Sequence, residues 1–108
     1  MAKKINYQLG KIYKIYSVSD PMTCYIGSTC QPYLCNRLQQ HIHAYKKIGD
    51  YNKCSKLYKF VHSKGGFNDF KIVLMENYPC LSSDDLTARE GYWQQEIQKD
   101  NKEIKLIL

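Results

Sequence analysis

Two short segments near the N-terminus, residues 11–17 and 24–29, constrain the fold more than any other feature of this sequence. Both are rich in β-branched and aromatic residues, which favour β-strands. Residues 19–21 between them are Ser-Asp-Pro, and these residue types are typical of tight turns. The pattern therefore predicts a β-hairpin.

The rest of the chain alternates between helical and strand-like patterns of apolar residues. The predicted elements are a helix over residues 32–48, a helix over 55–64, a strand over 70–77, and a helix that follows the capping residues 82–85 and runs to about 99. Residues 103–108 are apolar, and a terminal strand is one interpretation of this segment. The order β-β-α-α-β-α predicts an α/β domain in which helices cover a small mixed or antiparallel sheet.

The length of 108 residues and the apolar fraction of 44% predict a single folded domain over residues 1–108. The longest apolar runs are too short to span a bilayer, and the N-terminus lacks the apolar segment of a signal peptide. We therefore expect an intracellular protein without a membrane partner. The five cysteines are an odd number without a disulfide-type framework, and reduced thiols agree with this location.

The net charge of +6 is concentrated in residues 37–64, which contain seven basic residues and one acidic residue. The basic residues are Arg37, Lys46, Lys47, Lys53, Lys56, Lys59 and Lys64. A basic patch confined to one region indicates a polyanion as partner. A solvated lysine-rich face is an equally good interpretation of the charge alone.

One acidic residue interrupts an apolar stripe in the last predicted helix. Leu86, Glu90, Trp93 and Ile97 are spaced by four, three and four residues, so they lie along one side of that helix. A carboxylate on a core-facing stripe is unfavourable unless it is paired, protonated or bound to a cation. Glu90 is therefore either a salt-bridge partner at the edge of the core or a ligand for a hard divalent cation.

Arg37 and His41 are four residues apart, which places them next to each other on the first predicted helix. A guanidinium binds a phosphate with two hydrogen bonds, and a histidine one turn away can relay a proton. Two ordinary surface residues are the alternative. Tyr13 and Tyr25, at the centres of the two hairpin strands, either pack the sheet or direct hydroxyls at a reacting group. A tyrosine acts as a base when nearby cations lower its pKa from about 10.

These residues together resemble the GIY-YIG endonuclease superfamily. The first motif of that family stands here as Lys-Ile-Tyr at residues 11–13, with lysine in place of glycine, and the second stands intact as Tyr-Ile-Gly at residues 25–27. Arg37 and His41 match the arginine and histidine of the following helix. Residues 88–93 are similar to the segment that carries the family's metal-binding glutamate.

The resemblance covers about residues 10–101 and implies both a fold and an activity. The implied fold is a small three-stranded antiparallel sheet flanked by helices, with the catalytic groups on one face. The implied activity is hydrolysis of phosphodiester bonds in double-stranded or branched DNA. One Mg²⁺ or Mn²⁺ would assist it, and the products would carry 5′-phosphate and 3′-hydroxyl ends.

The resemblance also implies a role for each residue. By analogy Tyr13 is the general base, Tyr25 orients the water or binds the phosphate, Arg37 holds the scissile phosphate, His41 assists proton transfer and Glu90 holds the metal. Gly27 would leave the strand bare so that the phosphate can approach the backbone. Asn101 is the candidate for an asparagine that supports the site.

Two other functions compete with this interpretation. One is a catalytically inactive nucleic-acid-binding module on the same fold. The other is a zinc-stabilised interaction domain that uses Cys30, Cys35, His41 and His43. Whether the protein is a nuclease or an inactive nucleic-acid-binding module, we expect its contacts to DNA to come from basic side chains. These are Lys14, Lys46, Lys47, Lys53, Lys56 and Lys59.

Overall fold

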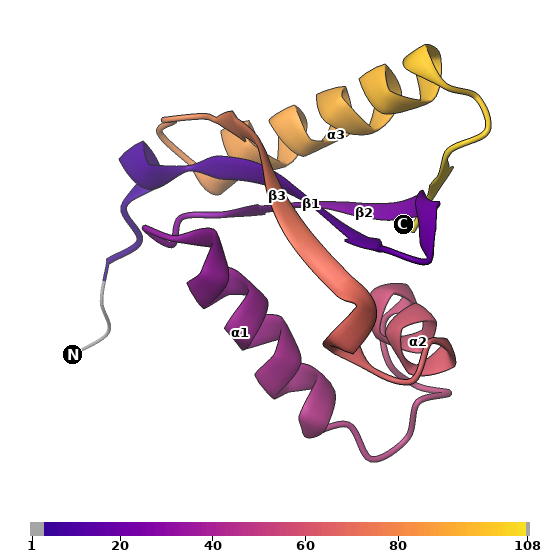
Figure 1. Ribbon diagram of the computed structural model, residues 1–108. Helices are drawn as coiled ribbons and strands as arrows, with labels where there is room; N and C mark the ends of the chain where they lie inside the picture. The colour runs from indigo at the N-terminus through magenta and orange to yellow at the C-terminus, as the bar shows by residue number, and fades with distance from the viewer. Residues whose placement is uncertain (1–3, 108) are drawn as a thin grey trace.

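A computed structural model of the protein describes residues 4–107 and contains one sheet with three α-helices (Figure 1). The strands are β1 (Lys11–Ser17), β2 (Asp20–Thr29), β3 (Phe70–Asn77) and β4 (Lys105–Leu106). The α-helices are α1 (Leu34–Lys46), α2 (Lys56–Ser63) and α3 (Ser83–Asp100). Short 3-10 helices lie at Tyr7–Leu9 and Phe67–Asp69. The predicted order of the first six elements is confirmed.

The strand order in the sheet is β3-β1-β2-β4, and β1 is antiparallel to both of its neighbours. The implied sheet of three antiparallel strands is therefore incomplete, because β4 adds a fourth strand that runs parallel to β2. The edge of β2 has unpaired backbone groups that attract such a segment. The Ile107 N–H donates to the carbonyl oxygen of Cys24 at 2.9 Å. The sheet is mixed, and the α/β class stands.

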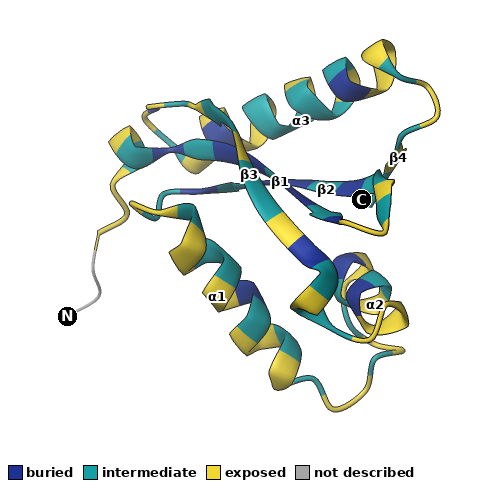
Figure 2. Ribbon diagram, in the orientation of Figure 1, coloured by how far each residue is buried: buried dark blue, intermediate teal, exposed yellow. Residues whose placement is uncertain are grey.

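The helices cover the two faces of the sheet separately, with α3 on one side and α1 and α2 on the other (Figure 1). Alternating residues of the strands supply both layers of the core. Ile12 and Ile26 pack towards α3, whereas Tyr13 and Ile15 pack towards the other two helices. Figure 2 shows that buried positions concentrate in β1 and β2, the central strands of the molecule.

Serine caps fix the starts of α2 and α3 close to the predicted positions. The Ser55 side chain accepts a hydrogen bond from the Tyr58 N–H, and the Ser82 side chain accepts one from the Asp85 N–H. Helix α1 is shorter than predicted, since it begins at Leu34 and ends at Lys46. Among residues 4–107, no helix is both long and apolar enough to cross a membrane.

The large apolar residues of α1 are only half-buried, and the one buried residue of this helix is His41. An imidazole needs hydrogen-bond partners when it is removed from water. The identity of those partners defines the site.

Candidate active site

The register of the hairpin brings the two tyrosines together on the face that α1 and α2 cover. Tyr13 stands opposite Gly27, and Ile15 stands opposite Tyr25. The rings of Tyr13 and Tyr25 have centroids 6.3 Å apart. A Cβ atom on Gly27 would lie 2.6 Å from the Tyr13 hydroxyl and 2.7 Å from the Tyr25 ring. The space above this glycine is thus occupied by the two rings, and it is not left bare for a phosphate as we expected.

Helix α1 contributes two groups that bind the Tyr13 hydroxyl. Arg37 Nε donates to Tyr13 Oη at 3.1 Å, and His41 Nε2 lies 2.8 Å from the same oxygen. Tyr13 is 0% exposed and His41 is 5% exposed, so these contacts are shielded from water. Arg37 and His41, which the sequence predicted to be adjacent on one helix, therefore both contact the Tyr13 hydroxyl.

A third tyrosine completes this chain of hydrogen bonds, and the sequence analysis did not identify it. Tyr58 Oη in α2 lies 2.8 Å from His41 Nδ1. Both ring nitrogens of His41 are therefore engaged by tyrosine hydroxyls. Tyr58 adjoins Leu57, Phe60 and Val61 in the sequence, where an aromatic residue looks like one more core position.

Burial sets the charge states of the central pair. It raises the pKa of Tyr13 well above its ordinary value, although the positive charge of Arg37 acts in the opposite direction. Burial, together with the same charge, lowers the pKa of His41 to about 4. At neutral pH the cluster therefore contains a phenol and an uncharged imidazole.

Glu90 belongs to α3, on the face of the sheet opposite to α1 and α2, and it reaches the edge of this cluster beside β2. The catalytic candidates therefore do not share one face of the sheet, contrary to what the resemblance implied. Its carboxylate accepts a hydrogen bond from the Ser28 hydroxyl, and Ser28 is the neighbour of Gly27. Burial raises the pKa of Glu90, while the Ser28 bond and the charge of Arg37 act to lower it. Among residues 4–107 Glu90 forms no ion pair. The salt bridge predicted as one alternative for Glu90 is therefore wrong. A half-buried carboxylate without a counter-charge fits a divalent cation, which is the other alternative.

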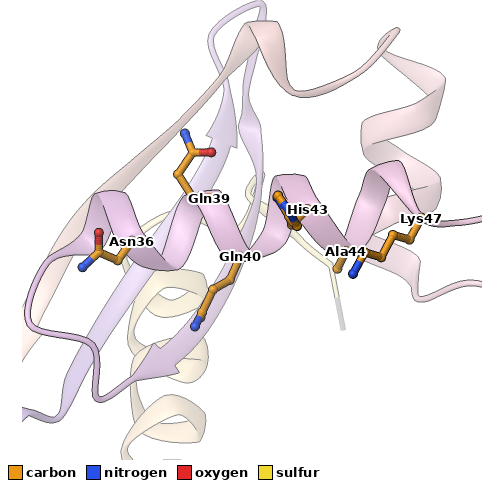
Figure 3. A pocket seen from close by; sticks show the side chains of 6 residues that line it. All are labelled: Asn36, Gln39, Gln40, His43, Ala44 and Lys47. Atoms are coloured by element: carbon orange, nitrogen blue, oxygen red, sulfur yellow. The ribbon is translucent and has the colours of Figure 1, made fainter.

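The accessible part of the site is a pocket of about 260 Å³. Its walls come from β2, α1, α2 with its N-cap, and the residue after β4, and they consist of Tyr25, Arg37, His41, Ser55, Lys56, Leu57, Tyr58 and Ile107. A separate depression runs along the outer side of α1, between Asn36 and Lys47 (Figure 3). None of the five expected catalytic residues lines that depression.

Two expected residues stay outside the cluster. Asn101 is the C-cap of α3, eleven residues after Glu90, which corresponds to about 16 Å along a helix axis. Its side chain accepts a hydrogen bond from the Glu103 N–H at 3.0 Å. Lys14 alternates with Tyr13 along β1, and its ammonium lies 5.4 Å from the centroid of the Tyr16 ring. Neither side chain has a hydrogen bond to Tyr13, Arg37 or His41 among the described residues.

The remaining basic candidates differ in their position. Lys46, Lys47, Lys53, Lys56 and Lys59 are all exposed. Lys56 alone among these five lines the pocket that contains Arg37. Its ammonium is thus the one best located to act on the same ligand as Arg37.

The zinc hypothesis finds no support in the geometry. Within the part of the chain that the structure describes, no group of three or more His, Cys, Asp or Glu side chains converges on one point. Both nitrogens of His41 already have tyrosine partners. Cys35 is an exposed free thiol and Cys30 is a half-buried one.

The curated proteins and the solved structures gave no significant match. The sequence model of the GIY-YIG catalytic domain matches residues 9–104, which is nearly the whole chain. This match covers both hairpin motifs, α1 with Arg37 and His41, and α3 with Glu90. The chain therefore belongs to the GIY-YIG catalytic domain family, a family of endonucleases.

Proposed function

We propose that this chain is a metal-dependent endonuclease that hydrolyses phosphodiester bonds of DNA. The observation that carries the proposal is a single cluster in which Tyr13, Arg37 and His41 share hydrogen bonds, within electrostatic range of the unpaired Glu90 carboxylate. Phosphodiester hydrolysis needs a base for the water, a donor for the phosphate and a cation for the developing charge. The cluster offers a group for each.

Arg37 is the group that we assign to the scissile phosphate. Its Nε donates to Tyr13 Oη at 3.1 Å and its Nη1 donates to Gln40 Oε1 at 3.1 Å. Among the described residues these bonds leave Nη2 without a partner, so it can donate to a phosphate oxygen. Lys56 and Tyr25 line the same pocket, and their ammonium and hydroxyl groups would bind the remaining oxygens.

Tyr13 is the proposed base, and its protonation state dictates how it acts. A neutral phenol accepts a proton from water only if it gives up its own proton at the same time. His41 Nε2 is 2.8 Å away and belongs to an uncharged imidazole, so it can take that proton.

Glu90 is the proposed ligand of Mg²⁺ or Mn²⁺, with water and phosphate oxygens as the other ligands. When bound, the cation neutralises negative charge that develops on the phosphate in the transition state. The Ser28 hydroxyl holds the Glu90 carboxylate in place through its hydrogen bond.

A plasmid cleavage assay with Mg²⁺ and with a chelator tests the proposal. The wild-type protein should cut only with the metal, and Tyr13→Phe should lower the rate by roughly 10²–10⁴-fold. The matched control is Tyr16→Phe, since Tyr16 is also in β1 but packs on the α3 face. A wild-type protein that binds DNA and never cuts it would support the inactive binding module instead.

A further inference from the structure

The hydrogen-bond chain does not end at His41, and its last member has no role in the proposed reaction so far. Arg37 Nε, Tyr13 Oη, His41 and Tyr58 Oη follow one another at 3.1, 2.8 and 2.8 Å. Tyr13 is fully buried, whereas Tyr58 lines the pocket. The chain therefore connects a buried hydroxyl with the pocket through one imidazole.

The donors of this chain can be assigned from the groups themselves. Arg37 Nε can only donate, so Tyr13 Oη accepts from it. If His41 Nε2 also donated to Tyr13, the proton of the Tyr13 hydroxyl would be buried without an acceptor among these partners. The satisfied arrangement has Tyr13 donating to Nε2 and the Nδ1 proton of His41 donating to Tyr58 Oη.

We propose that Tyr58 is a positioning residue of this site, whose hydroxyl keeps the His41 proton on Nδ1 and so leaves Nε2 free to accept the proton of Tyr13. The inference rests on the proposed function and adds to it a residue on α2. A neutral imidazole carries one ring proton, and the partner of one nitrogen decides which nitrogen holds it. Without Tyr58, nothing in the cluster would retain that proton on Nδ1.

The proton balance of the step follows from this arrangement. The water oxygen forms a bond to phosphorus as the bond from phosphorus to the leaving oxygen breaks, and the water proton goes to Tyr13 Oη. In the same step the original Tyr13 proton moves to His41 Nε2, the Nδ1 proton moves to Tyr58 Oη and the proton of the Tyr58 hydroxyl leaves to water in the pocket, so His41 stays uncharged. The leaving oxygen takes a proton from solvent. Each tyrosine oxygen keeps one proton, whereas His41 ends the step protonated on Nε2, and exchange of its ring protons with solvent restores the Nδ1 form before the next turnover.

The surroundings of Tyr58 hold its ring in the required orientation. The Tyr58 N–H donates to the Ser55 cap at 3.5 Å, which fixes the first turn of α2. The ring meets His41 edge-on, with centroids 5.8 Å apart and planes at 67°. Contacts with the rings of Tyr45 and Phe67 support its other sides. Burial raises the pKa of Tyr58, so the group stays a phenol at neutral pH.

The test compares Tyr58→Phe with Tyr45→Phe, in nuclear magnetic resonance spectra and in plasmid cleavage. Tyr45 is a matched control, because its hydroxyl also contacts a histidine, His62 Nδ1 at 3.2 Å, but lies outside the pocket. In the wild type, the ¹⁵N shifts of His41 should show a protonated Nδ1. Tyr58→Phe should move the proton to Nε2 and lower kcat by about 10- to 100-fold at unchanged KM. Tyr45→Phe should do neither.

The two readouts separate this inference from the proposed function. A wild-type protein that does not cut DNA overturns the proposed function, and the ¹⁵N shifts still decide where the His41 proton lies. If the wild type cuts DNA, an unchanged His41 tautomer or an unchanged kcat in Tyr58→Phe overturns the role of Tyr58.

Discussion

Glu76 of β3 and Glu90 of α3 are carboxylates with opposite surroundings. Glu76 accepts two hydrogen bonds from Arg89, at 2.5 and 2.8 Å, and a third from Trp93 Nε1 at 3.2 Å. Among the described residues Glu90 has the Ser28 hydroxyl as its hydrogen-bond partner and no cation. The Arg89 bonds lower the pKa of Glu76, whereas burial raises that of Glu90.

The sequence neighbour of Glu90 sharpens this contrast. Arg89 is one residue away, but successive positions of a helix point about 100° apart, so Arg89 faces Glu76 and not Glu90. The charge of Glu76 is satisfied within the fold. The charge of Glu90 has no such partner among the described residues, in agreement with the metal site proposed above.

The largest effect should come from Glu90→Gln, which keeps the shape of the side chain and removes its charge. We expect cleavage to fall by about 10⁴-fold, because cation stabilisation of the transition state is worth several kcal/mol. The free energy of unfolding should stay the same or rise, since a half-buried charge is removed. Cleavage rates, Mg²⁺ titration and urea unfolding measure these quantities. Near wild-type cleavage by this variant would rule out Glu90 as the metal ligand.

A smaller effect should come from acid, through His41, whose pKa burial lowers. The unfolded chain protonates His41 near pH 6.5 and the folded protein near pH 4, so the unfolded state binds more protons in between. Stability from the neutral imidazole is complete above pH 6.5 and should fall by up to about 3 kcal/mol towards pH 4. Urea unfolding at pH 7, 6 and 5 measures it.

The control for the acid effect is a pair of histidine variants. His41→Gln should remove this part of the pH dependence, and His62→Gln, at an exposed position, should keep it. Equal pH profiles for the wild type and His41→Gln would show that His41 does not become protonated in this range.

Glu76→Gln should have the opposite effects to Glu90→Gln, because it should change the stability of the fold and not the cleavage rate. We expect a loss of about 1–2 kcal/mol in the free energy of unfolding, because the Arg89 pair is partly exposed and screened by solvent. Cleavage should be unchanged. Glu96→Gln, which breaks the exposed pair with Lys99, should change neither quantity. A Glu76→Gln protein with normal stability and no cleavage would invert the assignment of the two carboxylates.

The smallest effect concerns basic residues that, like Glu90, have no counter-charge. Lys53, Lys56 and Lys59 form no ion pair among residues 4–107, whereas Lys64 pairs with Asp20. Replacing the three lysines by alanine should weaken DNA binding and flatten the plot of log affinity against log salt by up to about 0.9 per lysine. Binding measured over a salt series tests this, and an unchanged slope would place α2 away from DNA.

Local patterns were sufficient to predict the elements and part of the site. The caps at Ser55 and Ser82 are local features, and the strand over residues 70–77 was predicted with its observed bounds. Glu90 was identified because a carboxylate in an apolar stripe conflicts with its neighbours. Such conflicts within one element are visible without a structure.

Contacts between distant elements could not be predicted in this way. The bond between His41 and Tyr58 depends on how α1 and α2 pack after a nine-residue connection, and no local pattern encodes that packing. The pairing of β4 with β2 likewise depends on where α3 ends. The reason given for Gly27 was wrong because the tilt of the two tyrosine rings is a property of the folded hairpin.

Gly27 is a position at which this domain should not tolerate amino-acid substitution. Any side chain at this position would push against the Tyr13 and Tyr25 rings, so a substitution there would disturb the core and the chemistry together. The outer side of α1, by contrast, carries exposed residues such as Asn36, Gln39 and His43 (Figure 3). A mutant library should therefore keep Gly27 constant and place its changes on that helix surface.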